Sequence, residues 1–290
     1  MPELPEVETI RLGLDELIVG KTIDQVLVIN PSSFPNKSVE VDRYLIGASV
    51  EKLKRRAKIL IIDLSTEYAL VIHLKMTGQL VYVNHQHRFG AGHPNDSLVG
   101  SLPDKSTRVI LHFDDNSTLF FNDQRKFGWV KILPKYLLTD TNFFKLYGPE
   151  PLQKKFNLAT FKSQLLKHSK TSIKAALLNQ SIIAGIGNIY ADESLWLARI
   201  HPKSLIIDLT DDDVARLFKS IIAVLKLSLQ KGGSTSRNYL DAKGNKGNYL
   251  KFANVYGREG QPCLNCGQPI IKIRVASRGT HICLKCQQLK

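Results

Sequence analysis

Four cysteines near the end of the chain place the tightest constraint on what it can fold into. They follow the spacing C-x2-C-x16-C-x2-C, and no other position among the 290 residues is a cysteine: Cys263, Cys266, Cys283 and Cys286. Each close pair presents two thiolates on one side of a turn, so two such turns complete a tetrahedron around Zn²⁺. Disulfide bonds are the alternative, but a reducing cytosol disfavours them. The spacing predicts one structural zinc ion in a closed site, which leaves no coordination position for catalysis.

The stretch between the two cysteine pairs, "IIKIRVASRGTHI", predicts a β-hairpin over residues 270–282. Its tip reads "SRG", which would display Arg278 on a turn that the metal holds rigid. The plain interpretation of Arg278 is an arginine in solvent. The functional interpretation is a phosphate clamp, since a planar guanidinium can donate two parallel hydrogen bonds.

The charge of the chain points to a polyanionic partner. Forty Lys and Arg against 26 Asp and Glu give a net charge of +14, with a pI near 9.6. Residues 232–290 hold ten basic and two acidic residues, more than half of that excess. Solubility alone could explain a basic pI, but this clustering favours nucleic acid over an acidic membrane. No run approaches the roughly 20 apolar residues of a membrane span, and no secretory signal opens the chain, so we expect a cytoplasmic protein.

The first half of the chain reads as a β domain. Short runs rich in β-branched and aromatic residues fill residues 26–133, and turn residues such as "DDNS" separate them. Such runs predict an antiparallel sandwich or barrel. A helix should precede it, because apolar residues from Val7 to Leu17 fall on one helical face and Gly20 offers an end. Residues 84–105 show no periodicity and predict a loop.

The second half reads as helical. It follows a linker-like stretch, "LYGPEPL" at 146–152, and Thr210 with the acids behind it offers a helix cap. The apolar periodicity predicts four helices, over 158–168, 172–178, 188–198 and 211–231. The expected fold class is α+β: an N-terminal β-sandwich domain led by a helix, then a helical domain with a β-hairpin zinc finger.

Four segments, in order and spread over almost the whole chain, carry a family resemblance. They are "PELPEVE", "DQRKFG", "QSIIAGIGNIYADESLWLARIHP" and "SRGTHICLKCQ". Together they resemble the bacterial formamidopyrimidine-DNA glycosylases, base-excision repair enzymes with a helix-two-turn-helix and a zinc finger. The resemblance implies five parts: a catalytic β-sandwich domain 1–135, a linker 136–152, a helix-two-turn-helix domain 153–234, a lesion-capping loop 235–260 and a zinc finger 261–290.

The resemblance implies a covalent mechanism that starts at Pro2. In that family the N-terminal proline attacks C1′ of the damaged nucleotide, releases the base and forms a Schiff base, so Met1 would have to be removed. Glu3 would serve as acid and base beside it, and Lys58 would lower the pKa of the amine. Glu6 could act directly or only begin a helix. Arg278 would assist the β,δ-elimination that cuts the strand.

The resemblance also implies a plug for the DNA helix. An enzyme that everts a nucleotide must fill the gap, and the family's three inserted side chains match Met76, Arg125 and Phe127. Two apolar wedges and one donor suit an unstacked step with an orphaned base. On sequence alone, Met76 and Phe127 would equally pass for core residues.

Further DNA contacts follow from the same resemblance. Asn188 in "GIGNIY" matches a family residue that contacts backbone phosphates. The glycines before Asn188 form a turn that could cradle an anion or simply cap a helix. Arg237 and Tyr239 match the pattern of the lesion-capping loop. The chain departs from the family where a run that holds a phosphate-contacting histidine is replaced by "KSTRV", in which Lys105 or Arg108 could substitute for the histidine.

The expected partner is double-stranded DNA with an oxidised purine or an abasic site, bound by a monomer near the bacterial nucleoid and not at a membrane. Three alternatives remain open. An endonuclease VIII-like enzyme for oxidised pyrimidines is one, although Leu4 argues against it because those enzymes are associated with glycine there. The others are a non-catalytic zinc-finger DNA-binding protein and the zinc ribbon of an RNA-associated factor.

Overall fold

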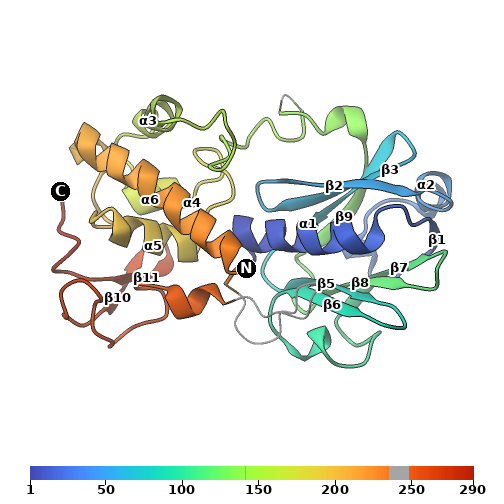
Figure 1. The fold of residues 1–290 in the computed structure, drawn as a ribbon. Coiled ribbons are helices and arrows are strands. Elements are labelled where there is room, and N and C mark those ends of the chain that lie inside the picture. The colour runs from blue at the N-terminus through green and yellow to red at the C-terminus, as the bar shows by residue number, and fades with distance from the viewer. Residues whose placement is uncertain (141, 235–247) are drawn as a thin grey trace. The chain divides into compact units, whose positions relative to one another are not determined.

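The computed structural model describes residues 1–140, 142–234 and 248–290. It divides into two compact units (Figure 1). The N-terminal unit comprises Met1–Lys145 and Lys231–Asn248, and the C-terminal unit comprises Leu146–Gln230 and Tyr249–Lys290. The finer division into five parts stays a prediction.

Two antiparallel sheets form the N-terminal unit. One has five strands in the order β1 (Ile23–Val28), β7 (Thr107–Phe113), β8 (Thr118–Asp123), β5 (Gly78–Val83) and β6 (Arg88–Gly92). The other has four, in the order β2 (Val50–Arg56), β3 (Ile59–Leu64), β4 (Tyr68–His73) and β9 (Trp129–Pro134). Side chains of both sheets, among them Leu60, Ile62, Leu80 and Tyr82, share one buried core. This arrangement confirms the predicted sandwich.

Helix α1 (Leu4–Ile18) covers the edge of both sheets, because it contacts the edge strand β2 of one and the edge strand β6 of the other (Figure 1). Covering an edge in this way hides unpaired backbone groups from other chains. The predicted apolar stripe does face the core. At Gly13 the helix comes so close to β6 that an added Cβ would lie 2.5 Å from the ring of Phe89.

The prediction of a loop over residues 84–105 is wrong. The segment contains β6 and a 3-10 turn at Asp96–Leu98, and Arg88 ties them by donating to the carbonyls of Leu98 (2.9 Å) and Gly100 (2.6 Å). The strand reads "RFGAG", whose small residues carry no strand signal. Strand β2 and helix α2 (Ser38–Tyr44) were not expected either. The charged "VEKLKRR" of β2 shows no two-residue alternation, because its register shifts between Val50 and Lys52 and its buried residues Val50 and Leu53 lie three apart.

The C-terminal unit follows its prediction closely. It holds α3 (Leu158–Leu166), α4 (Ile173–Leu178), α5 (Asn188–Leu197), α6 (Asp211–Gln230) and the hairpin β10 (Ile271–Val275) and β11 (Arg278–Ile282). Thr210 caps α6 as expected, since the Asp213 N–H donates to its hydroxyl and the Asp213 carboxylate accepts from its backbone, both at 3.1 Å. Short 3-10 turns lie at Ile206–Asp208 and Tyr249–Phe252 in this unit, and at Pro31–Ser33 and Lys135–Leu137 in the N-terminal unit.

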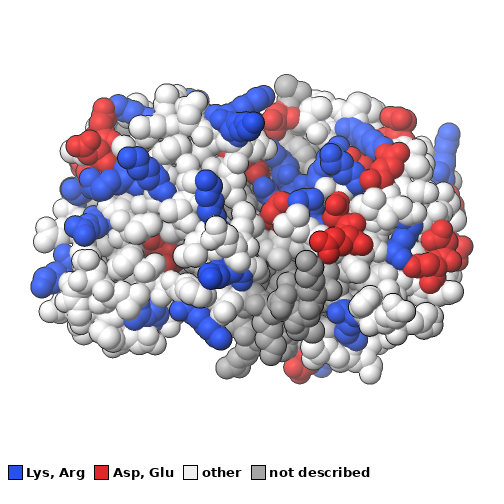
Figure 2. Space-filling model, in the orientation of Figure 1, with Lys and Arg blue, Asp and Glu red and all other residues white. Residues whose placement is uncertain are grey.

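Charge on the surface is mostly basic. Figure 2 shows lysine and arginine side chains over the visible face of each unit, with acidic side chains in smaller groups between them. Across the part of the chain that the structure describes, no helix has the length and apolar character needed to cross a membrane.

The Gly13 contact gives a stability prediction. Glycine to alanine normally stabilises a helix by about 1 kcal/mol. Here we expect Gly13→Ala to lower the free energy of unfolding by about 1–3 kcal/mol, because the new methyl group would overlap the buried Phe89 ring. Urea unfolding measures it, and in a Phe89→Leu background the loss should shrink. A gain in stability would contradict the close approach.

Candidate functional site

The amino end of the chain is held by the first turn of α1. The Glu6 carboxylate accepts the Glu3 N–H at 2.8 Å through one oxygen and the Ser234 N–H at 2.7 Å through the other. Pro2, Glu3 and Glu6 are all buried. The carboxylate of Glu6 therefore fixes the first residues of the chain against the segment at Ser234, beyond its role in starting the helix.

Lys58 belongs to the same site. It lies in the turn between β2 and β3, beside Ala57, which adopts a left-handed φ of 55°. Arg55 holds this turn, because its guanidinium donates to the Ala57 carbonyl (2.8 Å) and to the Glu8 carboxylate on α1 (2.8 Å). Helix α1 and the turn that carries Lys58 are thus tied to each other by a half-buried arginine.

The pKa of the α-amino group at the start of the chain depends on its burial and on the charges of Glu3, Glu6 and Lys58. Burial lowers its pKa below the usual value; the Glu3 and Glu6 carboxylates oppose that shift and Lys58 adds to it. The structure therefore brings the amino end, Glu3, Glu6 and Lys58 together; their catalytic roles stay a prediction. A weakly basic amine beside carboxylates can act as a nucleophile near neutral pH and exchange protons with a neighbour.

His73, at the end of β4, borders this site. Burial, with the nearby charges of Lys75 and Lys58, lowers the pKa of His73 to about 3. Its Nδ1 accepts the Lys75 N–H at 2.9 Å, which places the ring proton on Nε2. The ring is therefore neutral at physiological pH.

Met76, Arg125 and Phe127 project from two neighbouring turns into solvent. The side chains of Met76 and Phe127 are 41% and 55% exposed, so the interpretation of these two as core residues is wrong. The Arg125 guanidinium stacks over the Phe127 ring, 4.7 Å from its centroid. Large apolar side chains held in water at the end of turns are typical of a binding surface.

The two candidates for the missing histidine differ in exposure. Lys105 is exposed. Arg108 is 7% exposed, and its guanidinium donates to the backbone carbonyls of Asp123 (2.8 Å) and Thr107 (3.2 Å). A guanidinium turned inward onto carbonyls is poorly placed for a phosphate, so of the two the structure favours Lys105.

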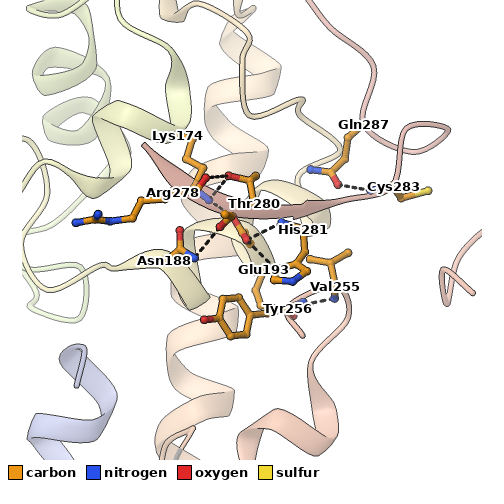
Figure 3. Close-up of polar contacts among 12 residues, drawn as sticks. Lys174, Asn188, Glu193, Val255, Tyr256, Arg278, Thr280, His281, Cys283 and Gln287 are labelled. Carbon is orange, nitrogen blue, oxygen red and sulfur yellow. Dashed lines mark hydrogen bonds and ion pairs between the residues drawn. The ribbon is translucent and has the colours of Figure 1, made fainter. Parts of the chain in front are cut away.

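In the C-terminal unit, Asn188 and Arg278 lie beside each other (Figure 3). The Asn188 side chain donates to the Gly279 carbonyl at 2.9 Å, which joins the start of α5 to the hairpin. The Arg278 side chain is exposed and extends away from the other residues drawn in Figure 3. The turn at Gly185–Gly187 offers fewer N–H groups to an anion than expected. The Gly185 N–H already donates to the Gln180 side chain at 2.9 Å.

A buried ion pair fixes the hairpin that carries Arg278. The Lys174 ammonium contacts the Asp192 carboxylate at 2.5 Å and the Thr280 hydroxyl at 2.7 Å, with Lys174, Asp192 and Thr280 almost wholly buried. The other Asp192 oxygen accepts the His281 N–H at 2.9 Å. A buried pair is stable only with its remaining hydrogen bonds satisfied, and the hairpin backbone supplies one of them.

Glu193 fixes a second segment of the C-terminal unit. Its buried carboxylate accepts the backbone N–H groups of Asn254, Val255 and Tyr256 at 2.8–2.9 Å. Sequence reasoning missed Lys174, Asp192 and Glu193, although charged residues on the buried face of a predicted helix are a usable signal. Arg237 and Tyr239 lie outside the described residues.

The four cysteines form a metal centre. Their Sγ atoms all lie within 4.8 Å of one another, with Cys263–Cys286 at 3.8 Å and Cys266–Cys283 at 3.4 Å. A tetrahedron with Zn–S bonds of about 2.3 Å has edges of about 3.8 Å, so the donor set fits Zn²⁺. The Trp196 indole N–H donates to the Cys263 sulfur at 3.4 Å, as expected for a donor that supports a thiolate ligand.

The tip of the zinc hairpin is strained. Ala276 and Ser277 have φ angles of 50° and 59°, the left-handed pair of a type I′ turn, which favours Asn and Gly. We expect Ala276→Asn with Ser277→Gly to raise the free energy of unfolding by about 1 kcal/mol per residue. Thermal unfolding of the zinc-loaded protein measures it. Ser277→Val should act in the opposite direction; stabilisation by valine would contradict the turn geometry.

His73 gives a pH prediction. Its pKa is about 6.5 in an unfolded chain and about 3 here, so the unfolded state binds a proton first as pH falls. Stability should drop between pH 6.5 and 3, by about 1–2 kcal/mol from His73 at pH 5. Urea unfolding at pH 7 and pH 5 should show a smaller drop in His73→Gln, whereas the exposed His85→Gln should behave like the parent chain.

Three family models match consecutive parts of the chain. The N-terminal domain of formamidopyrimidine-DNA glycosylase matches residues 1–130, and its H2TH domain matches residues 147–239. A zinc finger found in FPG and IleRS matches residues 260–289. This match and the clustered sulfur atoms agree on one structural zinc ion.

Relatives match over the full length. The formamidopyrimidine-DNA glycosylase of Enterococcus faecalis is 43% identical, over 100% of this chain and 98% of the relative. Lactococcus lactis Fpg, solved with DNA that contains N7-benzyl-Fapy-dG, is 34% identical with a TM-score of 0.87. MutM, solved with carbocyclic 8-oxo-G DNA, is 34% identical with a TM-score of 0.86; each match covers 99% of this chain and 100% of the solved chain. The chain belongs to the formamidopyrimidine-DNA glycosylase family.

Proposed function

We propose that this protein is a DNA glycosylase that removes oxidised purines, 8-oxoguanine and formamidopyrimidines, from duplex DNA and then cuts the strand at the abasic site. The observation that carries this is the start of the chain, where Pro2 is buried together with Glu3, Glu6 and Lys58. Family membership supports it, as do relatives solved with Fapy-dG and 8-oxo-G DNA. The absence of Pro2, Glu3 or Lys58 would have favoured a non-catalytic protein, but all three are present.

The reaction starts when Met1 is removed and Pro2 gains a free secondary amine. While Met1 remains, the Pro2 nitrogen is an amide without a basic lone pair. The amine attacks C1′ of the damaged nucleotide, the bond to the base breaks, and the base leaves with a proton. Opening of the sugar then gives an iminium ion between Pro2 and C1′. The same burial and the same Lys58 charge that lower the pKa of the present α-amine would act on Pro2.

Glu3 transfers protons during the reaction, and Lys58 affects the pKa of the amine. The Glu3 carboxylate, next in the chain to the nucleophile, gives a proton to the opening sugar and takes protons during elimination. Burial is the main cause that lowers the pKa of the amine, and the positive charge of Lys58 acts in the same direction. Glu6 positions Glu3, and with it the preceding Pro2, through its hydrogen bond to the Glu3 backbone, which explains its place without a direct role in the chemistry.

DNA contacts divide between the two units. Met76, Arg125 and Phe127 fill the gap that the everted nucleotide leaves, and Lys105 contacts a phosphate. Asn188 and Arg278 hold backbone phosphates beside the lesion, and the Arg278 charge favours departure of the second phosphate during β,δ-elimination. Their joint attachment to Gly279 and the hairpin supports this pairing.

The partner is double-stranded DNA with an oxidised purine or an abasic site. We further propose that one copy suffices and acts at the nucleoid. The position of Pro2, Glu3, Glu6 and Lys58 within one unit supports the first point, since a second copy is not required to complete this group.

Trapping of the covalent intermediate tests the nucleophile. With abasic-site duplex DNA and borohydride, the parent protein should form one stable adduct, which mass spectrometry places on Pro2. Pro2→Gly should trap at least about tenfold less, because the primary amine replaces the proline amine that the site positions. Lys58→Met should shift the pH midpoint of trapping upward. An adduct on an interior lysine, or undiminished trapping in Pro2→Gly, would refute the assignment.

A further inference from the structure

The turns that carry Met76, Arg125 and Phe127 meet at one buried carboxylate, and we infer that this residue, Asp123, is a positioning residue for nucleotide eversion. The inference rests on the proposed function, because it concerns how the proposed plug is kept ready. It adds a residue that does not itself touch DNA.

Asp123 is the last residue of β8 and is fully buried. One carboxylate oxygen accepts from the Thr77 hydroxyl and from the Arg125 N–H at 3.1 Å. The other oxygen accepts the Gly128 N–H at 2.6 Å. The carboxylate thus binds both ends of the loop Gln124–Phe127 and, through Thr77, the turn that carries Met76.

Thr77 completes the connection. Its hydroxyl oxygen lies 3.1 Å from the Arg125 N–H, so the same group donates to Asp123 and accepts from the opposite loop. Thr77 follows Met76 directly and is itself 8% exposed. A hydroxyl between a carboxylate and a backbone N–H fixes the spacing of the two turns.

The backbone of Asp123 is fixed as well. Its N–H donates to the Ser106 carbonyl at 2.8 Å, and its carbonyl accepts from the buried Arg108 guanidinium at 2.8 Å. The buried Arg108 therefore helps to hold the Asp123 backbone in place. Behind the loop, a Cβ added to Gly128 would lie 2.8 Å from the Phe121 ring and 3.1 Å from the Asp123 carboxylate, so the loop closes tightly on this group.

The two turns need such a support. Lys75 and Lys126, each directly before an apolar plug residue, have left-handed φ angles of 49° and 58°. That conformation is unfavourable for residues other than glycine, by about 1–2 kcal/mol each. The apolar side chains that follow are exposed and gain little from packing. Hydrogen bonds to Asp123 therefore hold the plug in the shape needed before DNA arrives.

This arrangement predicts a selective defect when it is broken. Insertion of the plug is required only where a base must leave an intact stack. Removal of an abasic sugar from a single strand uses the amino end, Glu3 and Lys58 but needs no plug. Loss of the connection should slow the first reaction and spare the second.

The test compares four variants with the parent protein: Asp123→Asn, Thr77→Val, Thr77→Ser and the control Thr118→Val. Thr118 lies at the other end of β8, where its hydroxyl contacts His112 at 3.1 Å. Single-turnover excision is measured on duplex DNA with 8-oxoguanine, and strand cutting on a single-stranded abasic oligonucleotide. Fluorescence of 2-aminopurine beside the lesion follows eversion, and thermal unfolding checks the fold.

We expect Asp123→Asn and Thr77→Val to lower duplex excision and the eversion rate about 10- to 100-fold, the usual effect of losing a hydrogen bond to a charged group. Single-strand cutting should stay within about twofold of the parent. Thr77→Ser, which keeps the hydroxyl, and Thr118→Val should match the parent in both assays. In a Met76→Ala/Phe127→Ala background, Thr77→Val should have little further effect, because the two changes act on one step.

Equal losses in the two assays, or no loss in Thr77→Val, would overturn the inference. If Asp123→Asn does not fold, the Thr77→Val and Thr77→Ser pair still decides, since serine keeps the hydroxyl that valine lacks. A parent protein that neither excises 8-oxoguanine nor cuts abasic DNA would instead refute the proposed function itself.

Discussion

The buried Glu6 carboxylate accepts backbone N–H groups from two segments that lie far apart in the sequence, Glu3 and Ser234. A buried carboxylate is unfavourable unless donors surround it, so the two segments and the carboxylate stabilise one another. The amino end of the chain, which would otherwise fray, is thereby held in place. Everything proposed for Pro2 depends on this.

The same device recurs at each functional part of the protein. Asp123 holds the turns with the exposed apolar residues, Asp192 holds the hairpin that carries Arg278, and Glu193 holds the segment after residue 248. In every case the carboxylate sits at the end of a strand or on a helix. The donors to Asp123 and Glu193 come from turns or loops, whereas those to Asp192 come from helix α4 and strand β11. Loops gain precision from a rigid element by this means, without a large apolar core of their own.

Much of this could be read from the sequence, and the exceptions have physical reasons. The cysteine spacing and the helix caps are local signals, so the zinc centre and the Thr210 cap followed directly. Strand β6 was missed because its glycines carry no propensity and its pairing with β5 is tertiary. Met76 could pass for a core residue because the sequence does not show whether a side chain on a turn faces the core or the solvent. Arg108 looked like a surface cation because its acceptors, two carbonyls, are invisible to any sequence pattern.

The indole of Trp196 has a use beyond supporting a thiolate. The chain has two tryptophans, and Trp129 lies in the sheet of the N-terminal unit, whereas Trp196 donates directly to the Cys263 sulfur. The electron density on that sulfur changes when a metal binds or leaves, and with it the polarity around the indole ring. Fluorescence of Trp196 should therefore report metal occupancy without an added dye, with Trp129, whose unit holds none of the four cysteines, as the background.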